Sequence, residues 1–451
     1  MADKDLPGDA VICGTGYIDG CPVAAFSQDF MIAAGTLGKM HAQKIVQVMK
    51  LAVKTGMPVV AFKDSGGARI QEGVDALSGY GEVFYHNVML SGVVPQIAVI
   101  CGPCAGGAAY SPALMDFVIM TRKNAYMFIT GPEVIKAVTG RATTMGEVGS
   151  AEVHASVNGN VHFVAEDDRH AVQIVQKLLS YLPPNNTEDP PHVFKPDIVL
   201  DRDESMNELI PDDSSEPMDV RKIIGRIVDG GELLEIHASW AKNLIVGFAR
   251  IEGIVVGLIA NQPTEMAGAL DINASDKGAR FIRFCNIFNI PIVTLVDVPG
   301  FLPGIEQERG GIIRHGAKML YAYAEATVPK ITIVLRKGYG GAKQALCTRE
   351  MGADQLFVWP GVELAVMGGG GAVNVLYRRE IELSSDPAKT RAEKVAEFQE
   401  RFNGPFEALS KQFAQAALHP ADTRKRLIQS LEILRFKKEE RPRKKHGVMP
   451  V

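Results

Sequence analysis

The sequence predicts an α/β protein built from two tandem copies of one domain. Runs typical of strands alternate with helical runs over short loops, as in residues 59–62, 76–91 and 95–100. A β-type run ending in Gly-Gly-Ala occurs at residues 95–108 and again about 234 residues later, at 329–342. With 451 residues, the chain is also too long for a single hydrophobic core.

The first copy begins with two short β-type runs, at residues 10–14 and 21–26. A helix is expected over 41–54, because its apolar residues recur at spacings of three and four. The strand at 59–62 leads into a glycine-rich turn at 64–73. The helix at about 76–91 and the strand at 95–100 follow. These elements give the strand and helix order of an α/β domain.

The second copy repeats this plan. Residues 249–257 match the opening runs, 289–297 match the strand before the first glycine-rich turn, and 298–304 replace that turn. A mixed-charge region at 391–438 predicts a helical extension used for packing or oligomer contacts. Residues 183–217, rich in Pro and Asp, predict an extended linker. The predicted domains are therefore 1–182 and 218–451, with 183–217 between them.

Composition and charge exclude several classes of function. The net charge of −4 provides no long-range attraction to nucleic acid, and the basic residues 441–446 are interpreted as a solvated or interface-bound terminus. The sequence contains no uninterrupted apolar run of about 18 residues, so no membrane-spanning helix is predicted. The start lacks a signal-peptide pattern, and six cysteines make no disulfide framework. A cytoplasmic protein is expected.

Cys101 and Cys104 form a CxxC pattern. A zinc site needs four ligands, and neither a second CxxC nor a His pair at ligand spacing accompanies it. The two cysteines follow a β-type run among small residues, which favours packing over redox chemistry. No metal site is predicted.

The two Gly-Gly-Ala stretches, 106–108 and 340–342, are the strongest functional signal. Without side chains, backbone N–H groups can approach a ligand oxygen closely. One such turn is more often packing, but paired copies at equivalent positions favour function. The chemistry they suit is acyl transfer or enolate formation, in which negative charge develops on an oxygen. No Gly-Lys-Ser/Thr follows either turn, which disfavours nucleotide triphosphate cleavage.

No nucleophile–base pair accompanies these turns. Ser65 lacks a G-x-S-x-G elbow. The histidines are scattered and are interpreted as structural: His41, His154, His162 and His315. This scatter fits a mechanism with oxyanion holes and a proton-accepting cofactor.

Seven motifs in order along the chain carry a specific family resemblance. They are DSGGARIQEG at 64–73, GPCAGGA at 102–108, FITGP at 128–132, DINASDK at 271–277, DVPGFLPG at 297–304, GIIRHGAKMLY at 311–321 and KKHG at 444–447. The chain resembles the carboxyltransferase subunit of biotin-dependent acyl-CoA carboxylases, a family that includes propionyl-CoA carboxylase β, methylmalonyl-CoA decarboxylase α and the transcarboxylase large subunit.

The resemblance implies two tandem crotonase-like domains, each a superhelix of ββα units related by duplication. It also implies transfer of CO2 between carboxybiotin and the α-carbon of an acyl-CoA, with propionyl-CoA or methylmalonyl-CoA expected. The biotin enolate would take the α-proton, and the thioester enolate would capture CO2. The net direction is not readable from the sequence.

The same resemblance implies the site residues. Gly106 and Gly107 would hold the thioester oxygen, and Gly341 and Ala342 the ureido oxygen of biotin. Further substrate-binding residues would be Gly66, Gly67, Ala68, Arg69, Ala108, Lys343 and Gln344. Further biotin-binding residues would be Gly340, Pro299 and Phe301.

The resemblance also implies partners. Biotin would arrive on a biotin carboxyl carrier protein, with biotin carboxylase as a possible further partner and coenzyme A thioesters as substrates. A homo-oligomer is implied, a hexamer built as a trimer of dimers, and a membrane decarboxylase complex stays open. No nucleic acid and no metal are expected.

Two departures from the family pattern stand out. Family members usually have an N-terminal helical segment that helps to cover CoA, ahead of the point where this sequence starts, so altered CoA affinity is expected. Lys343 stands where the family usually has tyrosine, and Gln344 occupies a position that influences acyl preference. Lys343 is either a snorkelling surface residue or a cation that attracts a substrate carboxylate.

Two rival functions remain open at this point. A biotin-independent crotonase-type decarboxylase, hydratase or isomerase would need acid–base carboxylates, for which Glu72, Glu133 and Glu265 are available without forming a diagnostic pair. The other hypothesis is a non-catalytic assembly partner with the same fold, and Lys343 favours this hypothesis.

Overall fold

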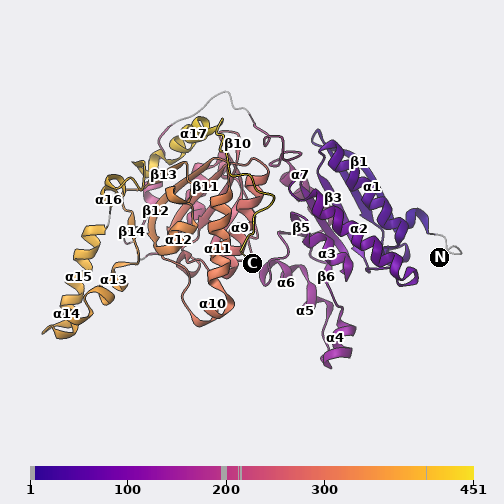
Figure 1. Ribbon diagram of the computed structural model, residues 1–451, viewed down its shortest axis with the longest axis horizontal. Coiled ribbons are helices and arrows are strands. Elements are labelled where there is room, and N and C mark those ends of the chain that lie inside the picture. The colour runs from indigo at the N-terminus through magenta and orange to yellow at the C-terminus, as the bar shows by residue number, and fades with distance from the viewer. Residues whose placement is uncertain (1–5, 194–200, 212, 214–215, 403, 451) are drawn as a thin grey trace. The chain divides into compact units, whose positions relative to one another are not determined.

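The computed structural model describes residues 6–193, 201–211, 213, 216–402 and 404–450 (Figure 1). The chain divides into two compact units. Unit 1 comprises Met1–Pro191 with Ile236–Trp240, and unit 2 comprises His192–Glu235 with Ala241–Val451. Each unit is described by itself.

Unit 1 is built around a seven-stranded sheet with the order β1-β2-β3-β4-β5-β7, and β6 pairs with β4. β1 and β2 are antiparallel, whereas the other pairs are parallel. The strands are β1 (Val11–Ile18), β2 (Cys21–Gln28), β3 (Val59–Ser65), β4 (Gln96–Ala105), β5 (Phe117–Thr121), β6 (Tyr126–Phe128) and β7 (Phe163–Ala165). The helices are α1 (Lys39–Thr55), α2 (Val74–Leu90), α3 (Gly107–Ala113), α4 (Pro132–Thr139), α5 (Met145–Gly149), α6 (Ala151–Ser156) and α7 (Asp168–Leu179).

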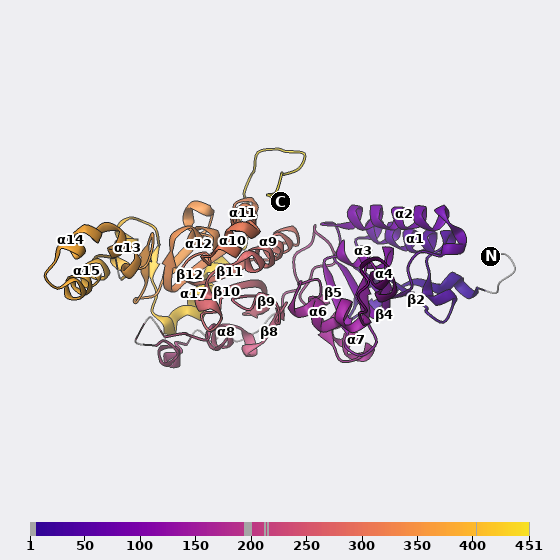
Figure 2. The same ribbon diagram turned by 90° about the horizontal axis from the view of Figure 1, so that it is seen from below.

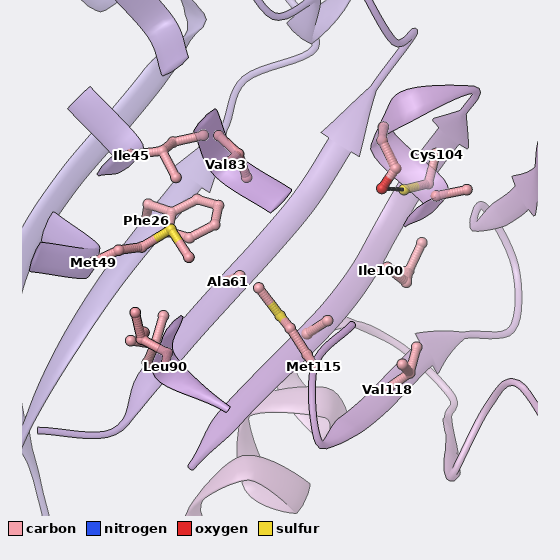
Figure 3. Close-up of a cluster of buried hydrophobic side chains, with 14 of the residues drawn as sticks. Phe26, Ile45, Met49, Ala61, Val83, Leu90, Ile100, Cys104, Met115 and Val118 are labelled. Carbon is pink, nitrogen blue, oxygen red and sulfur yellow. Dashed lines mark hydrogen bonds between the residues drawn. The ribbon is translucent and has the colours of Figure 1, made fainter. Parts of the chain in front are cut away.

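The core of unit 1 lies between the sheet and the pair α1 and α2, while α7 covers the opposite face (Figure 2). The α1 residues Ile45 and Met49 are fully buried against Phe26 of β2, and Leu90 of α2 closes the cluster (Figure 3). The side chains that face this core alternate along β3, with Val59 and Ala61 on the core side. Burial of both faces explains why the central strands appear in the sequence as apolar runs.

Unit 2 repeats the arrangement with an eight-stranded sheet of order β15-β13-β12-β11-β10-β9-β8, and β14 pairs with β12. The strands are β8 (Leu233–Ile236), β9 (Leu244–Ile251), β10 (Ile254–Asn261), β11 (Ile292–Val298), β12 (Lys330–Tyr339), β13 (Gln355–Val358), β14 (Glu363–Ala365) and β15 (Ala416–Ala417). The helices are α8 (Val220–Ile227), α9 (Ile272–Ile287), α10 (Ile305–Gly310), α11 (Ile312–Glu325), α12 (Gly340–Ala345), α13 (Gly369–Leu376), α14 (Arg378–Leu383), α15 (Pro387–Phe402), α16 (Pro405–Ser410) and α17 (Thr423–Leu434). α9 and α11 lie on one face of the sheet, and α8 and α17 on the other (Figure 2).

The duplication extends to local irregularities. The parallel pairing of β3 with β4 is interrupted between Lys63 and Ser65, and that of β11 with β12 between Val296 and Val298. In both copies, residues with positive φ precede the first long helix, at Ala33–Gly35 and Met266–Gly268. The predicted duplication and the predicted α/β fold class are therefore confirmed at the level of individual residues.

The C-terminal region differs from the predicted helical extension. Instead of a continuous helical region over 391–438, the chain forms α15, α16 and α17, with the short strand β15 between α16 and α17. β15 pairs in parallel with β13, at Phe357 and Val358. This region therefore completes the sheet of unit 2 as well as adding helices, which helical periodicity cannot show.

Part of the predicted linker is folded. Residues Glu204–Leu209 form a 3-10 helix, and Met206 is buried in the core of unit 2. The domain limits at residues 182 and 218 stay predictions. In the part of the chain that the structure describes, no helix combines the length and the apolar character needed to cross a bilayer.

Candidate active site

The first candidate oxyanion site is the turn between β4 and α3. β4 ends at Ala105, Gly106 has φ 59° and ψ −123°, and α3 begins at Gly107. An L-residue with a Cβ rarely adopts this conformation, so glycine is needed at position 106. The first N–H groups of α3 therefore follow directly after the end of β4.

The hydrogen bonds of this turn select its donors. The Gly106 N–H donates to the Phe128 carbonyl of β6 at 3.0 Å, so it is already engaged. The first N–H groups of an α-helix have no acceptor within the helix. Among the described residues, no acceptor is found for the N–H of Gly107 or Ala108. The geometry therefore favours Gly107 with Ala108 as donor pair, one residue later than the predicted pair of Gly106 and Gly107.

Buried side chains support this turn on its core side. A Cβ on Gly107 would lie 2.9 Å from Cδ2 of the Tyr80 ring, so the ring supports the backbone closely. The Ala108 carbonyl accepts a hydrogen bond from Cys104 Sγ at 3.1 Å (Figure 3). Burial raises the pKa of Cys104 to about 12, so its thiol stays protonated and donates.

The predicted glycine-rich turn after β3 lies against the first oxyanion turn. A Cβ on Gly67 would lie 2.8 Å from the Ala105 carbonyl oxygen. The Gly67 carbonyl accepts from the Leu37 N–H at 2.9 Å, and Ala68 forms a bridge with Leu37. The structure thus places Gly67 against Ala105, the residue before Gly106, and the substrate-binding role of Gly66, Gly67 and Ala68 stays a prediction.

Arg69, predicted to bind substrate, has its guanidinium engaged by protein acceptors. Its side chain is 1% exposed, and Nη1 contacts Asp9 at 2.5 Å and Glu72 at 2.8 Å. Nη2 donates to the Thr36 carbonyl at 2.8 Å. Because these protein acceptors engage the guanidinium, Arg69 holds the turn in place and is left out of the site proposed below.

The second candidate oxyanion site is the turn between β12 and α12. Gly340 has φ 58°, the same left-handed value as Gly106. A Cβ there would lie 3.0 Å from the Val366 carbonyl oxygen, so the adjoining loop also excludes a side chain. Gly341 is exposed, whereas Ala342 is buried with its methyl group in the protein. The N–H groups of Gly341 and Ala342 lie at the start of α12 as those of Gly107 and Ala108 do in α3.

Phe301 lies beside this second turn. A Cβ on Gly341 would be 3.9 Å from Phe301 Cε2, and one on Gly316 of α11 would be 2.9 Å from Phe301 Cε1. The neighbouring Leu302 N–H donates to the Leu270 carbonyl at 2.8 Å, which fixes the loop that carries the ring. Two residues predicted to bind biotin are thus adjacent, and Pro299 lies on the same loop after β11.

Lys343 and Gln344 follow on α12. Burial lowers the pKa of the half-buried Lys343, and its Nζ lies 5.3 Å from the centre of the Phe413 ring. In the described part of the chain, no carboxylate lies within ion-pair distance of Lys343. Gln344 Oε1 accepts from the Thr348 hydroxyl at 2.5 Å, so it is occupied within the protein.

The remaining polar candidates have structural partners. Ser65 Oγ accepts from the Gly67 N–H at 3.2 Å, and burial lowers the pKa of His41 to about 3. Other partners are the Met127 carbonyl for His154, the Val118 N–H for His162 and Asp276 for His315. Burial raises the pKa of Cys101 to about 12, and the described residues contain no cluster suited to a metal ion.

The carboxylates considered for the biotin-independent rival are dispersed. Glu72 accepts from Arg69 and from the Lys39 N–H at 2.7 Å. Glu133 lies on α4, and Glu265 lies on the loop before Met266 in unit 2; both are exposed. No pair suited to acid–base work emerges from these three residues.

Two buried charge arrangements were missed from the sequence. Lys63 Nζ donates to Ser111 Oγ of α3 at 3.1 Å. Arg336 donates to Asp297 Oδ2 through Nη2 at 2.7 Å and Nε at 2.9 Å. The available signal was a charged residue inside an otherwise apolar strand run, which is unusual for a central strand.

Comparisons with known proteins identify the family of this chain. Residues 1–449 match the family model described as a carboxyl transferase domain. The chain therefore belongs to the carboxyl transferase family, which confirms the resemblance and the prediction of an acyl-CoA carboxyltransferase.

Individual relatives cover nearly the whole chain. It is 55% identical to the methylmalonyl-CoA carboxyltransferase 12S subunit of Propionibacterium freudenreichii subsp. shermanii, over 99% of this chain and 84% of that protein. It is 52% identical to the methylmalonyl-CoA decarboxylase subunit alpha of Veillonella parvula, over 99% and 86%. A transcarboxylase 12S crystal structure with methylmalonyl-coenzyme A bound superposes with a TM-score of 0.97 at 54% identity, over 100% of this chain and 86% of that one.

Proposed function

We propose that this chain moves a carboxyl group between carboxybiotin and the α-carbon of a short acyl-CoA, with propionyl-CoA and methylmalonyl-CoA as the substrate pair. The observation that carries this proposal is the pair of equivalent turns, Gly106–Ala108 and Gly340–Ala342, each with bare N–H donors at a helix start. The names of the relatives support the substrate pair, since they act on methylmalonyl-CoA or are propionyl-CoA carboxylase chains.

The first turn binds the thioester oxygen in this proposal. When the α-carbon loses a proton or a carboxyl group, negative charge moves onto that oxygen. The N–H groups of Gly107 and Ala108 are fixed before the reaction, so they stabilise the charge without reorganisation. The adjacent Gly67 packs its backbone against the Ala105 carbonyl, where a Cβ would lie 2.8 Å from the oxygen, so this close packing holds the end of β4 that leads into the turn.

The second turn binds the ureido oxygen of biotin. When bound, biotin supplies a carboxyl carrier and a proton acceptor, which this chain's scattered histidines do not provide. The residues fit a ureido ring, because Gly341 offers an N–H beside open space and Phe301 supplies an apolar ring next to it. Gly341 and Ala342 orient the oxygen and stabilise charge on it.

Lys343 adjusts substrate choice in this proposal. Its ammonium is half buried and follows directly after the second donor pair, and among the described residues the charge of Glu350 acts on it but no carboxylate lies within ion-pair distance. An unpaired cation in such a place favours a substrate that carries its own carboxylate, as methylmalonyl-CoA does. The proposed role is to raise the affinity for the carboxylated member of the substrate pair.

The proposal includes partners. We propose that biotin reaches the second turn on a separate biotin carboxyl carrier protein, with biotin carboxylase as a further partner where the reaction runs toward carboxylation. A hexamer, built as a trimer of dimers, is the proposed assembly. The solved transcarboxylase 12S, described as a hexamer and as a multienzyme core, supports this part of the proposal.

A labelled-carboxyl assay tests the function. The purified chain is given methylmalonyl-CoA labelled in its free carboxyl group, with and without free biotin. Label that enters acid-labile carboxybiotin, only when biotin is present, is the expected result. Release of labelled CO2 at the same rate without biotin would instead establish a biotin-independent decarboxylase, and no turnover under either condition would establish a non-catalytic partner.

A further inference from the structure

The interior of unit 1 contains a buried lysine without a carboxylate partner. The Lys63 side chain is 2% exposed, and its Nζ lies 4.7 Å from the centre of the Phe26 ring. Its hydrogen-bond acceptor is Ser111 Oγ of α3, at 3.1 Å. Among the described residues, no Asp or Glu lies within ion-pair distance of Lys63. A buried cation with only neutral partners is costly, so such a residue needs an explanation beyond packing.

Ser111 links this lysine to a chain of buried amides. Ser111 Oγ donates to Asn87 Oδ1 of α2 at 2.9 Å, and Asn87 Nδ2 donates to Gln96 Oε1 of β4 at 3.0 Å. Ser111, Asn87 and Gln96 are fully buried. This network ties the helix that begins at Gly107 to the two elements beneath it.

The second copy shows that the fold does not need this charge. The strand registers make Val296 of β11 equivalent to Lys63, and the turns make Ala345 of α12 equivalent to Ser111. Both are buried and apolar, yet Gly340 keeps the same left-handed backbone as Gly106. Since apolar residues suffice to form the turn, the lysine and the serine are not required by its backbone geometry.

We infer that Lys63 is a positioning residue for the first oxyanion turn: its ammonium fixes α3 through Ser111 and adds positive potential beneath the N–H groups of Gly107 and Ala108. This inference rests on the proposed function, because it assumes that a thioester oxygen binds there. The ammonium is buried on the core side, so it stabilises developing charge through the electrostatic field and never contacts substrate. In the second copy the two equivalent positions, Val296 and Ala345, carry no charge.

The titration of Lys63 can be separated from that of its neighbours. Burial lowers the pKa of Lys63 to about 8. The ionisable groups near it on the packed elements are His41 of α1, Tyr80 of α2 and Cys104 of β4. The pKa of His41 is lowered to about 3, that of Cys104 is raised to about 12, and burial raises that of Tyr80. All three stay neutral between pH 7 and 9, so among these groups only Lys63 changes charge in that range.

The test combines a spectroscopic readout with kinetics. Propionyl-CoA labelled with carbon-13 at the thioester carbonyl is bound to the wild type, to Lys63→Met and to Ser111→Ala, and the carbonyl stretch is recorded by isotope-edited infrared spectroscopy. The wild type should shift the stretch to lower frequency than free thioester, and Lys63→Met should lose a large part of that shift. We expect kcat to fall about 10-fold in Lys63→Met, and the decline of wild-type kcat above pH 8 to disappear.

Controls distinguish this role from a loss of folding. Lys330 is a second buried lysine, whose Nζ donates to the Tyr323 and Ala326 carbonyls in unit 2. Lys330→Met should lower the Tm and leave the carbonyl shift unchanged. Ser111→Ala keeps the charge and should retain most of the pH dependence, so it decides the case if Lys63→Met does not fold.

Each outcome has a distinct meaning. A full carbonyl shift and an unchanged pH profile in Lys63→Met overturn the inference while the oxyanion site stands. The loss of the alkaline decline in Ser111→Ala would also overturn it, because the charge is still present in that variant. No shift in the wild type would remove the proposed oxyanion site itself.

Discussion

The two copies of the domain share the backbone of one turn and differ in the charges placed beneath it. Gly106 and Gly340 have φ 59° and 58°, and the strands before them carry the same interruption of pairing. In the second copy Asp297 is paired with Arg336, whereas the equivalent Asp64 faces Gly102, where a Cβ would lie 2.1 Å from Asp64 Oδ1. The geometry of the turn is thus separable from the electrostatics around it.

The charge difference has a clear physical result. Asp64 Oδ1 is buried and has no hydrogen-bond partner among the described residues. Burial, with the nearby Asp168 and Asp29 adding to it, raises the pKa of Asp64 to about 6. In the second copy, Arg336 provides the opposite charge at 2.7 Å and the Lys337 N–H adds a further donor at 3.2 Å. In the second copy the charge of Asp297 is therefore balanced by Arg336. In the first copy Asp64 has no such partner, and it takes up a proton more readily.

The largest expected effect is on activity, from Gly341→Ala. Its φ is not left-handed and the nearest atom to the new Cβ is 3.9 Å away, so the chain should fold normally. The methyl group would nevertheless occupy the space in which the ureido oxygen must approach the N–H donors. We expect the carboxyl transfer rate to fall about 100-fold, comparable to the loss of one oxyanion donor, with an unchanged Tm.

Gly225→Ala is the matched control for this substitution. Gly225 lies on α8, and its added Cβ would meet no atom within 4 Å. Its activity should equal that of the wild type. A Gly341→Ala enzyme as active as Gly225→Ala would show that the second turn binds no reacting oxygen.

The next effect is on stability, from Arg336→Met in the second copy. Removing the guanidinium leaves the Asp297 carboxylate, 2% exposed, without its charge partner. Breaking a buried ion pair from one side costs about 3–5 kcal/mol, so calorimetry should show a clearly lower Tm. The double variant Asp297→Leu with Arg336→Met should recover most of this loss. An equal loss of stability in the single and the double variant would mean that the pair stabilises the fold by packing and not by charge.

A smaller effect is expected on substrate choice, from Lys343→Tyr. The substitution removes the proposed partner of the substrate carboxylate and supplies the residue usual in the resembling family. We expect the ratio of kcat/KM for methylmalonyl-CoA to that for propionyl-CoA to fall about 10-fold, as for the loss of one charged contact. Unchanged kinetics on both substrates would leave Lys343 as a surface residue packed on Phe413.

The smallest expected effect is a pH-dependent gain in thermal stability from Asp64→Asn in the first copy. Because the folded protein raises the pKa of Asp64 to about 6 from an ordinary value of 3.8, the unfolded chain loses the proton more readily. Stability contributed by Asp64 is therefore greatest below pH 4 and is lost as the pH rises toward 6. Asp64→Asn should raise the Tm by at most about 3 °C at pH 7 and by nothing near pH 3.5. A lower Tm at pH 7 would show that the carboxylate has a stabilising partner.

The fold and the turns could be predicted because their signals are local. Strand runs, helical spacing and the glycines at 106 and 340 depend on neighbouring residues, so the sequence displays them directly. The family resemblance assigned both Phe301 and Gly341 to biotin, whereas their proximity comes from the structure. The local signals and the resemblance together therefore predict where the candidate site lies.

The rest depends on contacts between distant residues. Lys63 meets Ser111 across 48 positions and Arg336 meets Asp297 across 39, and no periodicity encodes either pair. The family resemblance implies that Arg69 binds substrate, but it does not reveal that Asp9, 60 positions earlier, accepts a hydrogen bond from its guanidinium. The strand β15 was hidden in a region of helical composition, since two residues cannot establish a period of two.

One binding measurement tests most directly the claim that the two turns hold different oxygens. The Kd of propionyl-CoA and the kcat/KM for free biotin are measured on the wild type and on Gly341→Ala. An unchanged Kd for propionyl-CoA with a kcat/KM for biotin reduced about 100-fold is expected, because only the ureido oxygen depends on the second turn. Weakened propionyl-CoA binding with normal biotin kinetics would contradict the assignment and place the thioester oxygen at Gly341.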